Sequence, residues 1–200
     1  MRKTVSILLL GLVACSSAVD RTVAPMSHDD DLYAMYSVVL ESLFLVSEHS
    51  GSAPPRFVIS DSTIGMPFVT AYDLAYVREK FRVAHASAFD AVEQTMSKEE
   101  SRPASLQASR FRTRAPVEIV SHADLASLDR ANFWDAFYAR FSGARGHITL
   151  GTPLIDRTGR YALMQYGHGC GWLCGDYGYI LLEKTAAGWV VLQRVITVMN

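Results

Sequence analysis

The sequence predicts an α+β domain in which N-terminal helices pack on a mainly antiparallel sheet with a C-terminal β-meander. Two observations carry this prediction. Apolar residues recur at helical spacing in the first half of the chain. The C-terminal part instead has short apolar runs joined by polar or glycine-containing turns, the pattern of paired strands. No internal repeat or low-complexity segment interrupts the 200 residues, so a single domain is the simplest organisation.

The chain begins with a targeting segment, residues 1–14. Two cations precede an apolar run shorter than the about 20 residues that span a bilayer, which is typical of a signal peptide. The run ends in LVAC, similar to the lipobox of bacterial lipoproteins, whose cysteine receives acyl chains such as palmitate. The sequence therefore predicts lipidation of Cys15. The alternative is ordinary cleavage nearby, for example after Ala18, which would discard Cys15.

A lipid on Cys15 would anchor the chain to a membrane of the bacterial cell envelope, because two acyl chains hold a protein firmly. Ser16 after the cysteine is compatible with an outer-membrane position facing the periplasm. Residues 15–31 are polar and are expected to form a flexible tether. The globular domain is expected to span residues 32–200.

The chain carries 19 basic and 20 acidic residues, a net charge of −1. This balance gives no electrostatic basis for binding nucleic acid. The three aspartates Asp29, Asp30 and Asp31 precede an apolar segment, and are expected to complement the N-terminal end of a helix. Metal binding by His28 with these aspartates is the alternative interpretation. No cofactor is expected.

The elements of the first part follow from periodicity and turn residues. Residues 98–116 look least regular; Arg110, Arg112 and Arg114 would share one face if they formed a strand, where they could meet anionic polymers. A solvated loop or edge strand is the simpler interpretation. Aromatic residues of the helix around 132–141 recur every three or four positions, which favours a core role. The expected helices are 32–48, 72–82, 86–97 and 132–141, and the expected strands are 57–59 and 117–120.

The C-terminal strands are expected at 147–150, 161–166, 177–184 and 189–199, with a turn at 185–188. Between the second and third lies GHGCGWLCGDYG, the most distinctive segment of the chain. In an oxidising compartment, Cys170 and Cys174 are expected to form a disulfide. Two alternatives are a redox-active dithiol and a metal site of His168, Cys170 and Cys174, with Asp176 as a further ligand.

The C-terminal part resembles a family of uncharacterised bacterial secreted proteins and lipoproteins that carry a CGxLCG motif between β-strands. The matching stretches are FWDAF, GHITL, YALMQY, CGWLCG, YILLEK and GWVV, within residues 132–192. The first helix and FVISDST are less similar, and the ending ITVMN departs from the family pattern. Because the family has no known activity, the resemblance implies the architecture and the disulfide only.

For function, the sequence favours a non-catalytic binding domain over an enzyme. Neither a GxSxG nor an HExxH motif is present. A hydrolase could draw on Ser60, Ser62, His122 and Asp124, but such residues also occur by chance. Partners of the binding domain would be an envelope protein, a polysaccharide, or a toxin or enzyme that it inhibits. The expected contact residues are Trp172, Tyr177 and Asp61, although Trp172 and Tyr177 could simply cover the end of the sheet.

Overall fold

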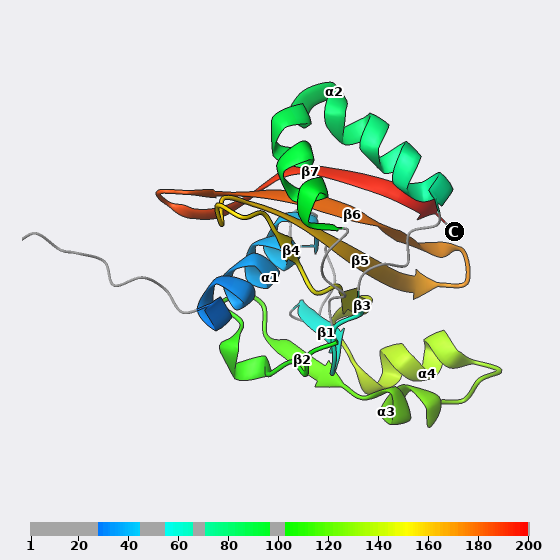
Figure 1. The fold of residues 1–200 in the computed structure, drawn as a ribbon. Coiled ribbons are helices and arrows are strands. Elements are labelled where there is room, and N and C mark those ends of the chain that lie inside the picture. The colour runs from blue at the N-terminus through cyan, green and yellow to red at the C-terminus, as the bar shows by residue number, and fades with distance from the viewer. Residues whose placement is uncertain (1–27, 45–54, 66–70, 97–102, 200) are drawn as a thin grey trace, which may run out of the picture.

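The computed structural model describes residues 28–44, 55–65, 71–96 and 103–199. In this part of the chain, helices pack on both faces of a mixed sheet with seven strands (Figure 1). The α+β class and the C-terminal meander are therefore confirmed. The predicted signal peptide, Cys15 and most of the predicted tether lie outside the described residues.

The sheet has the strand order β2-β1-β3-β5-β6-β7, and β4 (Leu154–Ile155) pairs only with β5. The strands β1 (Arg56–Ser60), β2 (Val117–Val120) and β3 (Ala144–Leu150) pair in parallel. The remaining pairs are antiparallel: β3 with β5 (Tyr161–Gly171), β5 with β6 (Cys174–Thr185), and β6 with β7 (Gly188–Met199). The sheet thus joins a parallel half to the antiparallel meander.

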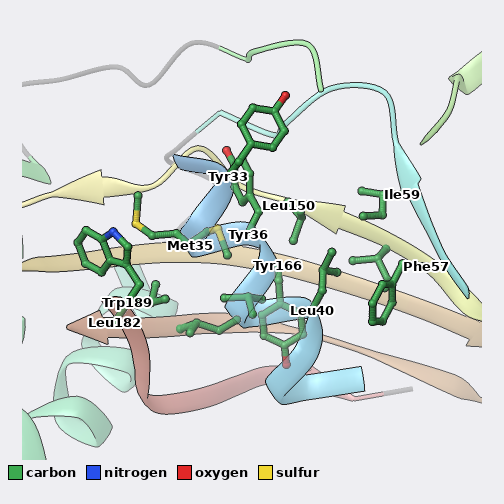
Figure 2. Packing of buried hydrophobic residues seen from close by; sticks show 14 of the residues in the cluster. Tyr33, Met35, Tyr36, Leu40, Phe57, Ile59, Leu150, Tyr166, Leu182 and Trp189 are labelled. Atoms are coloured by element: carbon green, nitrogen blue, oxygen red, sulfur yellow. The ribbon is translucent and has the colours of Figure 1, made fainter. Parts of the chain in front are cut away.

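One face of the sheet is covered by α1 (His28–Phe44). Figure 2 shows Tyr36, Met35 and Leu40 of this helix among side chains from the strands. All three are fully buried, and burial of such a side chain contributes about 1.5 to 3 kcal/mol. Asp31, in the first turn, accepts hydrogen bonds from Lys184 Nζ at 2.6 Å and Trp189 Nε1 at 3.3 Å. These bonds hold the start of α1 at the β6–β7 turn.

The other face carries α2 (Ala71–Met96) over the meander and α4 (Phe133–Arg140) over the parallel strands. α2 changes direction at His85, whose backbone is not helical. The aromatic face of α4 packs as core, as predicted, with Phe137 and Phe141 buried against Val58. A short helix, α3 (His122–Ala126), begins at Ser121 with a reciprocal capping box to Asp124.

The predicted start of the first helix was wrong, whereas two other predictions for this part of the chain hold. The first helix begins at His28, four residues before the predicted start, because Asp29, Asp30 and Asp31 form its first turn. The two predicted helices 72–82 and 86–97 are confirmed as the two halves of α2, which the non-helical backbone of His85 separates. The segment around Arg112 is a loop, as the simpler interpretation expected: a 3₁₀ turn, η1 (Ala108–Arg110), precedes irregular chain. Arg110 and Arg114 pair with Asp29 and Glu41 of α1.

Candidate functional site

The glycine-rich segment forms the end of a long hairpin rather than a loop between short strands. β5 and β6 remain paired up to Gly171 and Cys174, so that Trp172 and Leu173 alone make the turn. Cys170 and Cys174 form a disulfide across the base of this turn, with their Cα atoms 5.0 Å apart. The predicted disulfide is therefore present. Residues 170–174 are called the hairpin tip below.

The side chains of the hairpin tip point largely into solvent. Trp172 is 69% exposed and Leu173 is 90% exposed. Tyr177, on β6 next to the tip, is 44% exposed, and its ring lies over Gly167. The alternative that Trp172 covers the end of the sheet is not supported, because most of its side chain is exposed to solvent. Adjacent, large and strongly exposed apolar residues are typical of a contact surface.

Residues of α4 support the hairpin tip from one side. The Tyr138 hydroxyl donates a hydrogen bond to the Cys170 carbonyl at 2.9 Å. The Trp134 ring lies over Gly169, where an added Cβ would be 3.2 Å from the nearest ring carbon. A side chain at position 169 would therefore require the Trp134 ring to shift by a few tenths of an ångström. The tip is held by the disulfide, the strand ladder and α4 together.

A cluster of charged and polar groups lies just below the hairpin tip. Asp176 is buried and forms an ion pair with Arg194 on β7. The Tyr166 hydroxyl donates to Asp176 Oδ2 at 3.1 Å and accepts a hydrogen bond from Arg194 Nε. Burial raises the pKa of Tyr166, against the opposing effect of the Arg194 charge. This arrangement ties β5, β6 and β7 together at the base of the hairpin tip.

His168 completes this cluster. Its Nε2–H donates to the Arg145 carbonyl at 2.7 Å, and its Nδ1 lies 3.6 Å from Asp176 Oδ1. Burial lowers the pKa of His168; the hydrogen bond to Arg145 opposes this shift, and the Arg194 charge adds to it. His168 is thus oriented toward Arg145 and Asp176, while the two thiols of the alternative metal site are bonded to each other. Among the described residues, no group of three or more His, Cys, Asp or Glu side chains could hold a metal ion.

The residues considered for a hydrolase do not come together as expected. Ser60 Oγ lies 3.0 Å from Nε2 of His147, a residue that the sequence did not single out. Asp124 caps α3 and pairs with Arg140 at 2.9 Å, while His122 is exposed on the same short helix. Ser62 donates to the neighbouring Asp61 at 3.2 Å. The histidine beside Ser60 is therefore not His122 but His147, which β3 brings there from 87 positions away.

We expect His147 to make the protein less stable in mild acid. Burial, with a smaller contribution from His168, lowers its pKa from 6.5 to about 4. Below pH 6.5 the unfolded chain binds a proton that folded His147 does not, so stability falls between pH 6.5 and 4. The full loss is about 3 kcal/mol at 1.36 kcal/mol per pKa unit. Urea unfolding at several pH values from 7 to 4 should show this loss, and His147→Gln should reduce it. If the free energy of unfolding of the variant fell with pH as steeply as that of the wild type, the pH dependence would not come from His147.

We expect removal of the disulfide to loosen the hairpin tip more than it destabilises the domain. The cysteines are four positions apart, and closing so short a loop contributes about 2 kcal/mol. Cys170→Ser/Cys174→Ser should lower Tm by about 4 to 8 °C, while chymotrypsin should cleave faster after Trp172 and Leu173. Loss of the folded state, or unchanged cleavage, would show that the disulfide has a different role.

The third expected contact residue, Asp61, does not join the hairpin tip. It follows β1, which β3 and β5 separate from β6. Its backbone amide donates to the Val120 carbonyl at 2.9 Å, and its exposed side chain accepts from Ser62. The sequence missed Leu173, the most exposed of the large apolar residues in the described ranges. The only sequence signal for it is an apolar pair at a turn, where polar residues and glycine are usual.

No helix in the described part of the chain is long and apolar enough to cross a membrane. The comparisons with known proteins give no relative: no family model, no curated protein and no solved structure matches this chain.

Proposed function

We propose that this chain is an envelope lipoprotein, anchored through Cys15 in the outer membrane, whose domain binds a protein partner without catalysis. The observation that supports the proposal is the disulfide-bonded hairpin tip with Trp172 and Leu173 exposed. The resemblance to secreted proteins with the CGxLCG motif also supports the proposal. That motif contains the two cysteines of the disulfide and the exposed pair Trp172 and Leu173.

The chemistry of the hairpin tip favours a protein groove as the binding site. Between Gln165 and Leu182, the only carboxylate or cationic Lys or Arg side chain is Asp176, which is buried and paired with Arg194. The tip therefore presents apolar surface without charge. A tryptophan of this kind is a frequent hot spot of protein interfaces, and burying a leucine contributes about 1.5 to 3 kcal/mol. By contrast, the aliphatic side chain of Leu173 cannot stack on a sugar ring, which disfavours a polysaccharide as the partner.

Binding through the hairpin tip costs little conformational entropy. The disulfide, the Tyr138 hydrogen bond and the ion cluster fix its backbone in advance, and contacts that are ordered before binding lose less on association. This rigidity supports recognition of a preformed groove.

The position of the tip relative to the start of α1 also fits a binding role. Asp31 holds the start of α1 at the β6–β7 turn through Lys184 and Trp189. The hairpin tip lies at the other end of β6, which has 12 residues and is about 40 Å long at ~3.3 Å per residue. A tether that leads into α1 therefore reaches the domain at the end opposite the tip. An anchored domain can direct the tip away from its own membrane.

A photo-crosslinking amino acid at position 173 tests this proposal in cells that naturally make the chain. We expect a discrete, light-dependent adduct with another protein. The same amino acid at Thr158, exposed in the turn before β5, is the matched control and should give none. Trp172→Ser should reduce the yield at position 173. Absence of an adduct at position 173, or the same products at both positions, would overturn the proposal.

A further inference from the structure

A serine and a histidine lie side by side on one face of the sheet, and the contact proposed at the hairpin tip does not use them. Val58 of β1 packs against α4, and because side chains alternate along a strand, Ser60 lies on the same face. His147 of β3 is the strand partner of Val58, so it lies on this face too. Ser60 Oγ is 3.0 Å from His147 Nε2. Both residues are only partly buried, so neither is closed off from solvent.

Further hydrogen-bonding side chains continue this row across the sheet. Thr149 of β3 pairs with Gly167 of β5, and its hydroxyl lies 3.5 Å from the Gly167 carbonyl oxygen. Gly167 is in turn the partner of Tyr177 on β6, whose ring lies over it. This row is called the polar row below and consists of Ser60, His147, Thr149 and Tyr177. None of its side chains is charged at neutral pH, because burial lowers the pKa of His147 to about 4.

His147 has the position and the protonation state of a general base for Ser60. A neutral imidazole carries its proton on one ring nitrogen only. With that proton on Nδ1, Nε2 accepts a hydrogen bond from the Ser60 hydroxyl, at a distance that allows proton transfer. The neighbouring Ser62 has no such base, because its hydroxyl donates to the Asp61 carboxylate at 3.2 Å. Contact with an imidazole therefore distinguishes Ser60 from Ser62.

We propose that Ser60 is a nucleophile, activated by His147, that takes up an acyl group from an activated ester. Ser60 Oγ forms a bond to the carbonyl carbon of the ester while its proton passes to His147 Nε2. The bond between the carbonyl carbon and the leaving group then breaks, and the leaving group departs with this proton. The products are an ester on Ser60 and a free alcohol or phenol, and His147 is neutral again.

The chemistry around Ser60 selects this class of acyl donor. The polar row suits a neutral ester, whereas the exposed carboxylate of Asp61 disfavours an anionic donor such as a phosphate ester. A base with a pKa of about 4 is weak at neutral pH, so the donor needs a good leaving group. The ester formed on Ser60 has a poor leaving group, and water therefore removes it slowly. Ser60 is thus a modification site without turnover, and this inference does not rest on the binding role of the hairpin tip.

Treatment of the full chain, purified in detergent, with p-nitrophenyl acetate at pH 7 tests this proposal. Mass spectrometry of the digested protein at successive times measures the rate of acetylation at each residue. We expect Ser60 to be acetylated faster than any other serine. Ser60→Ala should lose this acetylation, and His147→Gln should slow it by about 100-fold, the contribution of a general base.

Ser62→Ala is the matched control, because Ser62 is partly buried like Ser60 but donates to a carboxylate. This variant should acetylate at Ser60 as fast as the wild type does. Absence of an acetyl group from Ser60, or equal rates at Ser60 and Ser62, would overturn the proposal. So would an unchanged rate in His147→Gln, since Ser60 would then react without a base. Unchanged circular dichroism of each variant establishes that it is folded.

Discussion

Asp176→Asn is expected to destabilise the domain by about 3 kcal/mol or more, because it leaves Arg194 partly buried without its carboxylate. Asp176 is the acceptor for both Arg194 and the Tyr166 hydroxyl, so the substitution weakens links to β5 and β7 together. Removing one partner of a buried pair costs more than removing both. The double variant Asp176→Asn/Arg194→Gln should therefore lose less than the sum of the single losses. Urea unfolding at pH 7 measures the free energy of unfolding of Asp176→Asn, Arg194→Gln and the double variant.

Glu118→Gln is the matched control for this prediction. Glu118 also pairs with an arginine, Arg56, but both side chains are about 40% exposed. Such a surface pair contributes less than about 1 kcal/mol. Equal losses for Asp176→Asn and Glu118→Gln would contradict the structural role assigned to the cluster below the hairpin tip.

Gly146→Ala is expected to cost about 3 to 5 kcal/mol, from backbone strain and overpacking together. Gly146 has φ +112°, and an added Cβ would be 2.2 Å from the Gly169 carbonyl oxygen and 2.8 Å from His168 Nε2. It lies where the pairing of β3 with β1 shifts register, between the partners of Arg56 and Val58. The variant should accumulate poorly and unfold well below the wild-type Tm.

Gly159→Ala separates these two contributions. Gly159 also has positive φ, +71°, but an added Cβ would have no neighbour within 4 Å. Its cost should be the backbone strain alone, about 1 to 2 kcal/mol. If Gly146→Ala were no more costly than Gly159→Ala, the close contact between β3 and β5 would be wrong.

The features that the sequence predicted well are local. The turn at 185–188, the acidic first turn of α1 and the disulfide each depend on residues within a few positions of one another. Backbone sterics, helix-end electrostatics and the short spacing of the cysteines determine these features. The aromatic face of α4 was also predictable, because its spacing of three and four residues is independent of what packs on it.

The features that the sequence did not predict depend on distant parts of the chain. Glycines 167, 169 and 171 suggested a loop, since glycine weakens isolated strands. In the structure they lie within β5, where the Tyr177 and Trp134 rings occupy the space over Gly167 and Gly169. The parallel pairing of β1 with β2 and β3, and the contact of Ser60 with His147, likewise join segments more than 50 positions apart.

The central claim is that Trp172 and Leu173 bind a protein partner. Its most direct test is to titrate the purified chain against the protein crosslinked from position 173, by isothermal calorimetry. Trp172→Ser should weaken binding by at least about 30-fold, the 2 kcal/mol of an interface hot spot, while Val83→Ser should bind as wild type does. An unchanged Kd for Trp172→Ser/Leu173→Ser would contradict the account.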